Sequence, residues 1–236
     1  TLTNSGTIQS KRNINLNNSK DSVSNSGSLL ADGNLTVRDT TSSGRLDINN
    51  TGRMQAAKVV DIKGYNDGNN LNLTVGQAGV LKGNGLTLNA NTVDNSGIIQ
   101  SDSSSSKLNI SANTFNNNGA NSLLLDTATD GENTLNVTGA LKNEGAVHGV
   151  GSFKITTGSL TNSNTAGISS NNALYLTTSN DFTNYGALYA GNNLSLSASG
   201  KNIINKSTMD SDRDMSINSG AFTNYWSVNA SGNIDI

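Results

Sequence analysis

The chain contains 236 residues with a formal net charge of −2; 33% of the residues are hydrophobic, 14% are charged, and proline and cysteine are absent. The lack of cysteine excludes disulfides, thiol catalysis and cysteine-based metal sites, and no basic stripe or arm supports a nucleic-acid partner. No apolar run approaches the roughly 18 residues of a membrane-spanning helix. Such a composition predicts a thin core of small aliphatic residues, repeated along an axis, rather than a compact globule.

One five-residue pattern recurs along the whole chain: an apolar residue, any residue, Asn, any residue and Gly. Its eleven copies begin at Leu2, Val23, Ile48, Val75, Val93, Phe115, Leu141, Leu160, Phe182, Ile203 and Phe222. The copy at Val75 is degenerate and carries Gln77 in the Asn position. The other copies carry Asn4, Asn25, Asn50, Asn95, Asn117, Asn143, Asn162, Asn184, Asn205 and Asn224. Because this position moves from 4 to 224 in ten steps, the mean period is 22 residues, which is typical of repeat architectures.

A second pattern follows each copy of the first. Four residues after the Gly position come a small residue, a turn, an Asn or Asp, and an apolar–any–apolar segment, as in Ala31, Asn34, Leu35 and Val37. The period of two within these segments predicts short, half-buried strands bounded by Gly and Asn turns. The polar insertions over residues 101–106 and 126–133 are predicted to be loops that bulge from this framework.

A coil of about 22 residues cannot bury its own apolar side chains, whereas a stack of such coils can. We therefore predict an all-β fold, a right-handed parallel β-helix (β-solenoid) of about eleven coils of about 22 residues each. Residues 1–236 would form a single domain, a monomeric rod cut from a longer repeat array. A leucine-rich repeat is disfavoured because its Leu-x-x-Leu-x-Leu core is absent.

The repeated Asn and Gly positions carry their own predictions. The Asn side chains of successive coils are expected to hydrogen-bond to one another along the rod as an Asn ladder. The Gly two residues later is expected to supply the positive φ that a tight corner needs.

The repeats resemble those of filamentous haemagglutinins and of the related CdiA-type effectors of contact-dependent growth inhibition. The segments 2–10 and 23–35 carry this resemblance most clearly, and it extends over essentially the whole chain. It implies a secreted protein at the bacterial cell surface, exported by an outer-membrane transporter of two-partner secretion. It also implies a partner on another cell, such as an outer-membrane protein, lipopolysaccharide or a host glycan.

Residues suited to catalysis or metal binding are few. His148 is the single histidine and falls in a position that the alternation turns outward, where a solvated side chain is expected. Asp210, Asp212 and Asp214 alternate, but the calcium-loop pattern fails because Met215 stands where a Gly is required. A solvated turn accounts for these acids. We therefore predict no enzyme activity, no cofactor and no metal.

The aromatic residues are the main candidates for a binding site. They are concentrated near the C-terminus, together with one lysine, and the candidates are Tyr175, Tyr185, Tyr189, Lys206, Tyr225 and Trp226. The repeat alignment places Tyr185, Lys206 and Tyr225 in one outward position of three successive coils, at a spacing of about 4.8 Å. Such a column can stack on sugar rings or anchor a protein partner. Two alternative interpretations are ordinary cross-strand stabilisation and packing against further coils of a longer array.

Three functions remain open at this point. The first is a non-enzymatic rod segment that projects from a cell and binds a receptor or glycan. The second is a polysaccharide-active or tailspike-like β-helix enzyme, which would need a groove with clustered carboxylates. The third is a passive spacer without a ligand.

Overall fold

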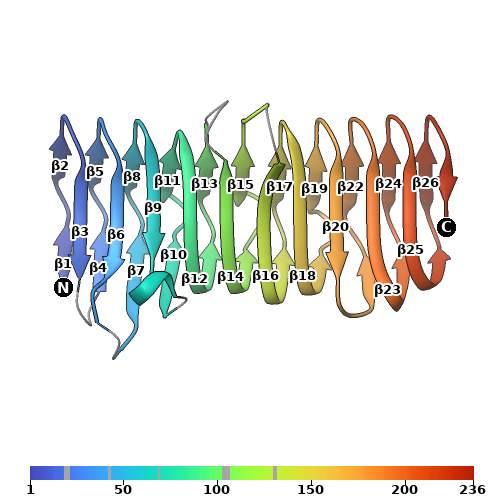
Figure 1. Ribbon diagram of the computed structural model, residues 1–236, viewed down its shortest axis with the longest axis horizontal. Coiled ribbons are helices and arrows are strands. Elements are labelled where there is room, and N and C mark those ends of the chain that lie inside the picture. The colour runs from blue at the N-terminus through green and yellow to red at the C-terminus, as the bar shows by residue number, and fades with distance from the viewer. Residues whose placement is uncertain (19–21, 42–43, 69, 103–106, 130–131) are drawn as a thin grey trace.

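The computed structural model describes residues 1–18, 22–41, 44–68, 70–102, 107–129 and 132–236. They form an all-β solenoid in which every pairing between strands is parallel and joins one coil to the next (Figure 1). One 3₁₀ turn, η1 (Tyr65–Asp67), is the helical segment among the described residues. Within that part of the chain, no helix has the length and apolarity that a bilayer crossing requires.

Each coil contributes strands to three faces of the rod. The first face contains the separate strands β1 (Leu2–Asn4), β4 (Ser22–Asn25), β7 (Leu46–Asn50), β10 (Leu71–Val75) and β21 (Phe182–Asn184). The second face is an 11-stranded sheet of β2 (Thr7–Ser10), β5 (Ser28–Ala31), β8 (Arg53–Ala56), β11 (Val80–Gly83), β13 (Ile98–Ser101), β15 (Leu123–Asp126), β17 (Ala146–Gly149), β19 (Gly167–Ser170), β22 (Ala187–Ala190), β24 (Thr208–Ser211) and β26 (Ser227–Ala230). The third face contains β3 (Ile14–Asn18), β6 (Leu35–Asp39), β9 (Val59–Lys63), β20 (Leu174–Thr178) and β27 (Ile234–Asp235).

Six long strands cover the third face and then the first. They are β12 (Gly85–Asn95), β14 (Leu108–Asn117), β16 (Glu132–Asn143), β18 (Ser152–Asn162), β23 (Leu194–Asn205) and β25 (Met215–Asn224). In β12, for example, residues 85–89 pair with β9 of the third face and residues 92–95 pair with β10 of the first. These strands lie toward the viewer in Figure 1 and curl around the lower edge of the rod.

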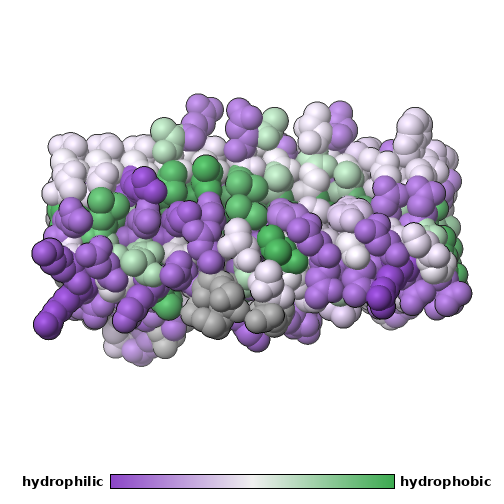
Figure 2. All heavy atoms as spheres, turned by 90° about the horizontal axis from the view of Figure 1, so that it is seen from above, coloured by the Kyte–Doolittle hydropathy of each residue, from purple (hydrophilic) through white to green (hydrophobic). Residues whose placement is uncertain are grey.

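The core is a set of stacked aliphatic columns, as the alternation predicts. In β7 the burial alternates strictly, with Leu46, Ile48 and Asn50 inside and the two residues between them exposed. The largest fully buried side chains include Phe115 and Phe153. Seen from above in Figure 2, hydrophilic and near-neutral residues cover most of the visible face, and apolar residues lie along its middle, mostly over the central coils.

The corner between the first and second faces is held by a ladder of Asn side chains, all buried except Asn224 in the last coil. Except at Asn50 and Asn224, each Nδ2 donates to the Oδ1 of the Asn in the next coil, from 2.8 Å between Asn4 and Asn25 to 3.0 Å between Asn184 and Asn205. Many also donate to a backbone carbonyl of the next coil, as Asn117 does to Ala146 O at 3.0 Å. The ladder joins Asn4, Asn25 and Asn50, and again Asn95, Asn117, Asn143, Asn162, Asn184, Asn205 and Asn224. The ladder thereby gives hydrogen-bond partners to side-chain amides that would destabilise the fold if they were buried without them.

The sequence alignment of the fourth coil is wrong by two residues. Val75, rather than Gln77, pairs with Asn50 on one side and Asn95 on the other. An apolar side chain therefore interrupts the ladder, and Asn50 donates to Val80 O instead, at 2.9 Å. Gln77 is exposed in a longer corner, closed by a hydrogen bond from Gly79 N to Gly76 O at 2.8 Å.

The reason predicted for the Gly position is also wrong. Of the glycines in that position, Gly119 alone has a positive φ, of 83°. What excludes a side chain elsewhere is the preceding coil: a Cβ on Gly52 would lie 2.2 Å from the Gly27 carbonyl oxygen. The requirement comes from coil-to-coil contact and not from the conformation of one corner.

The clash with the preceding coil predicts that Gly52→Ala destabilises the rod. We expect a loss of about 1–3 kcal/mol, because overpacking against backbone forces neighbouring coils to shift. Chemical denaturation followed by circular dichroism measures the change. Gly6→Ala is the matched control, because a Cβ there meets no atom within 4 Å. Equal losses for both variants would contradict the steric explanation.

The ladder predicts that Asn117→Ala is strongly destabilising. The change removes the bonds that link Asn117 to Asn95 and Asn143 and leaves buried polar groups unpaired, at a cost of about 1–3 kcal/mol each. The neighbouring Asn116 bonds Asp94 on the outer surface at 2.7 Å. Asn116→Ala should therefore cost no more than about 1 kcal/mol in the same denaturation experiment. A smaller loss at Asn117 than at Asn116 would refute this role of the ladder.

Candidate functional site: an aromatic corner

The acids and the histidine considered for catalysis have structural partners and do not converge. His148 lies in the outward column between Leu125 and Ser169, and its Nδ1 is 2.8 Å from the Ser169 hydroxyl. It is half-buried rather than fully solvated, and burial lowers its pKa. Across the described residues, no three His, Asp or Glu side chains gather closely enough to hold a metal ion.

The three alternating acids serve three different contacts. Asp210 accepts a bond from Asn229 at 2.8 Å, on the outer surface of the second face. Asp212 accepts a hydrogen bond from the Tyr189 hydroxyl at 2.8 Å. Asp214 lies at the turn position and accepts the backbone N–H of Asn233 at 2.8 Å, which fits the turn role inferred from the sequence.

Four of the aromatic-site candidates lie at or beside the Asn-ladder corner, just outside the ladder. The backbone N–H of Tyr185, Lys206 and Tyr225 each bonds the Asn carbonyl of the preceding coil, so they occupy one slot in three coils. Lys206 Nζ lies 5.1 Å from the centre of the Tyr185 ring, within the range of a cation–π contact. We call Tyr185, Lys206, Tyr225 and Trp226 the aromatic corner.

Tyr185 shows that this slot is exposed in the interior of the rod. Tyr185 has a coil on either side of it, yet 45% of its surface is exposed. Tyr225 and Trp226 follow it in the last coil and are 67% and 70% exposed. Large apolar rings held open on a rigid backbone form a ready contact surface, because little conformational entropy is lost when they bind.

Tyr189 and Tyr175 lie outside this corner. Tyr189 faces outward from β22 between Ser169 and Asp210, and its hydrogen bond to Asp212 raises the pKa of its hydroxyl. It therefore borders the corner on the second face. Tyr175 belongs to β20 on the third face, beside Lys154. The structure separates Tyr175 from the group in which the sequence placed it.

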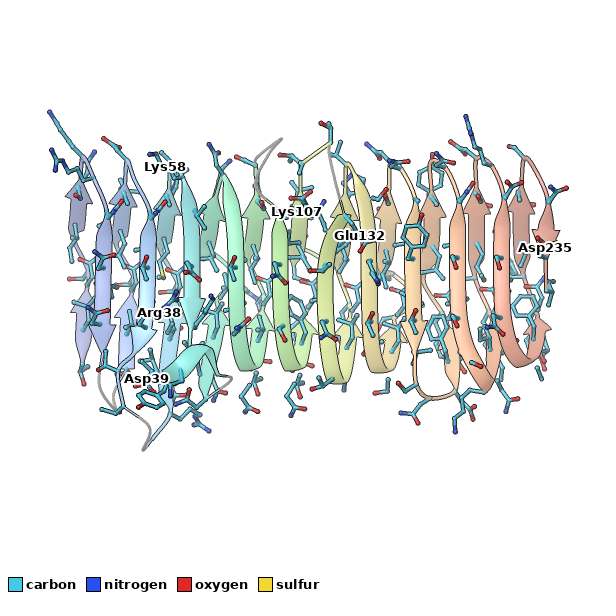
Figure 3. The ribbon with its side chains drawn as sticks, in the orientation of Figure 1. Arg38, Asp39, Lys58, Lys107, Glu132 and Asp235 are labelled. Atoms are coloured by element: carbon cyan, nitrogen blue, oxygen red, sulfur yellow. The ribbon has the colours of Figure 1, made fainter. Side chains whose placement is uncertain are left out.

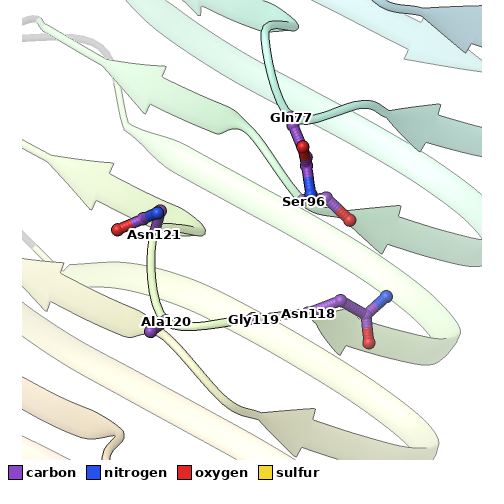
Figure 4. A pocket seen from close by; sticks show the side chains of 6 residues that line it. All are labelled: Gln77, Ser96, Asn118, Gly119, Ala120 and Asn121. Atoms are coloured by element: carbon purple, nitrogen blue, oxygen red, sulfur yellow. The ribbon is translucent and has the colours of Figure 1, made fainter.

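A small notch lies further along the same corner, between two longer turns (Figure 4). The turn that carries Gln77 and the turn over residues 118–121 flank the tighter corner at Ser96. The resulting depression of about 220 Å³ is lined by amide and hydroxyl groups. Sequence spacing alone did not indicate it, because it arises from unequal corner lengths in adjacent coils.

Sequence reasoning missed a buried acid in the core. Asp126 was assigned to a loop, but it ends β15, is fully buried, and occupies the small-residue column between Ser101 and Gly149. Its Oδ2 accepts bonds from Asn133 Nδ2 at 2.6 Å and from Ala128 N at 3.0 Å. Its Oδ1 and the Ser101 hydroxyl have no hydrogen-bond partner among the described residues. Residues 103–106 and 130–131 of the two expected loops lie outside the part of the chain that the structure describes.

Comparison of the chain with protein-family models, with curated proteins and with solved structures found no match.

The buried acid predicts a stability that rises as the pH falls. Burial raises the pKa of Asp126 from 3.8 to about 6, outweighing the hydrogen bonds that lower it, and nearby Asp102 adds to the rise. The folded state therefore holds the proton more tightly than the unfolded state, and its stability should increase as the pH falls from above 6 to below 4. The penalty at pH 7 is on the order of 3 kcal/mol.

Asp126→Asn tests this prediction. We expect the variant to be more stable than the parent at pH 7 and to lose most of the pH dependence between pH 7 and 4. Urea unfolding across that range measures both effects. Asp94→Asn, on the outer surface, is the control and should keep the slope of the parent. An unchanged slope in Asp126→Asn would show that another group governs the pH dependence.

Proposed function

We propose that this chain is a non-enzymatic rod segment of a secreted, cell-surface filamentous exoprotein. It projects from a bacterium and uses its aromatic corner to contact a receptor or glycan on another cell. The column formed by Tyr185, Lys206 and Tyr225 carries this proposal, since it combines exposed rings with a cation 5.1 Å from one of them. The repeats' resemblance to filamentous haemagglutinins and CdiA-type effectors supports export by two-partner secretion through an outer-membrane transporter.

The rod geometry supports a role in display. Parallel coils at a spacing of about 4.8 Å extend the described residues along one axis. The same geometry presents each outward slot as a straight column. A partner with a flat sugar ring or an apolar side chain can therefore meet several rings at fixed positions, and the lysine adds affinity for an anionic group such as phosphate or carboxylate.

Cell binding tests the proposal directly. The purified chain would be titrated on Gram-negative cells, on mutants with truncated lipopolysaccharide or lacking single outer-membrane proteins, and on epithelial cells. We expect saturable binding that falls at least tenfold in a variant carrying Tyr185→Ala, Tyr225→Ala and Trp226→Ala. Tyr65→Ala, which changes the first residue of η1, is the matched control. Circular dichroism establishes that each variant is folded.

The outcomes separate the competing functions. Binding to bacteria that disappears in one surface mutant would identify a receptor for growth inhibition, whereas binding to epithelial cells alone would identify an adhesin. Degradation of a cell-surface polysaccharide would favour the β-helix enzyme. No binding to any cell would leave a passive spacer and would refute a contact role for the aromatic corner.

A further inference from the structure

The third face of the rod carries two outward columns of polar side chains that form a long open depression. Its volume is about 490 Å³, and it crosses the four strands β12, β14, β16 and β18. One column contains Asn89, Ser111, Asn136 and Thr156, and the other contains Asn109, Thr134 and Lys154. We call this depression the polar groove; it lies on the face turned toward the viewer in Figure 1.

Several side chains in the polar groove have hydrogen-bonding capacity left for a ligand. Asn136 is exposed, and the side chains of Ser111, Asn136 and Thr156 have no hydrogen-bond partner within the described part of the chain. Thr134 and Asn109 bond each other at 3.0 Å, which leaves the Asn109 amide N–H₂ as a donor. Amides and hydroxyls both donate and accept, so they can bind groups that do the same.

The charge of the polar groove is close to balanced. Lys154 is its one cation, and Glu132, at the start of β16 (labelled in Figure 3), lies 3.7 Å from it. The N-terminal part of the same face differs, because Arg38, Asp61 and Lys63 form ion pairs there. Apart from this ion pair the lining from β12 onward is polar and uncharged, which favours a neutral ligand over a sulfated or phosphorylated one.

Tyr175 extends the polar groove at its C-terminal end. It is the register partner of Lys154 in the next strand and is 39% exposed, so its backbone lies one strand spacing, about 4.8 Å, beyond that of the lysine. An aromatic ring beside rows of amides and hydroxyls is the combination that suits a sugar. The ring packs against the apolar face of a pyranose while the polar groups bond its hydroxyls.

From these observations we infer that the polar groove binds a neutral, extended oligosaccharide along the rod axis, with Tyr175 stacking on one of its rings. The side chains of each column repeat once per coil, and the distance between coils is close to the length of one sugar unit. Successive sugar units of the ligand therefore meet similar side chains. From Asn89 to Tyr175 this site spans about 19 Å, long enough for several sugar units. The site is separate from the aromatic corner and does not depend on the proposed function.

Isothermal titration of the whole chain with defined oligosaccharides tests the inference. The probes are cellohexaose, maltohexaose and chitohexaose as neutral ligands, cellobiose and maltose as short ones, and a heparin hexasaccharide as a charged one. We expect one neutral hexasaccharide to bind with 1:1 stoichiometry, and the short and charged probes at least tenfold more weakly. Tyr175→Ala should weaken binding at least tenfold, and Thr156→Val, which removes one hydroxyl at nearly constant shape, about three- to tenfold.

Two matched controls locate the site. Thr36→Val lies on the same face in β6, outside the polar groove, and should leave the dissociation constant unchanged. The triple variant of the aromatic corner should also bind normally.

The inference is overturned if no neutral hexasaccharide binds at millimolar concentration, or if heparin alone binds. It is equally overturned if Tyr175→Ala and Thr156→Val bind like the parent, or if the aromatic-corner variant loses binding. Cell binding that survives Tyr175→Ala would leave the proposed function intact in each of these cases.

Discussion

Every feature of this rod depends on the register between one coil and the next. A single coil buries almost nothing, so its apolar residues are protected only when those of its neighbours lie directly above and below them. The buried Asn ladder fixes that register, because an amide displaced by one position along the strand would lose its partner and turn toward solvent. The close approach of Gly52 to the Gly27 carbonyl imposes the same alignment sterically.

A fixed interior leaves the exterior free to vary. Because inward positions are committed to the core, outward positions form straight columns whose chemistry changes from coil to coil without affecting the stack. The aromatic corner and the polar groove are two such surfaces on different faces, one with exposed rings and the other with amides and hydroxyls. The rod thereby offers rigid, repeating surfaces to ligands that are themselves extended.

The strongly periodic features were predictable from the sequence, and the exceptions to periodicity were not. Alternation and a repeated Asn were enough to predict the strands, the parallel stacking and the slot shared by Tyr185, Lys206 and Tyr225. The five-residue pattern places Gln77 in the Asn position because Gly79 follows it two residues later. The strand β10 ends before this corner, however, and its register puts Val75 in that position. Asp126 was misassigned because an acid at the start of a polar insertion predicts a loop, and the small-residue column that buries it is visible only in register. The polar groove was missed for a related reason: its side chains are commonplace individually and become a site only when coils align them.

Each of these exceptions is a local departure of one coil from the repeat, and such departures bear on function. Val75 and the longer turn beside it interrupt the Asn ladder, and the notch at Ser96 lies at the same corner. Asp126 introduces into the core a carboxylate oxygen that has no hydrogen-bond partner among the described residues, next to the two insertions after Ser101 and Asp126. In a repeat protein the stability of each coil depends mainly on its neighbours, so a local departure costs free energy locally and leaves distant coils intact. The fold can therefore tolerate specialised coils wherever enough regular coils flank them, and such departures, rather than the consensus positions, are where coils become distinct from one another.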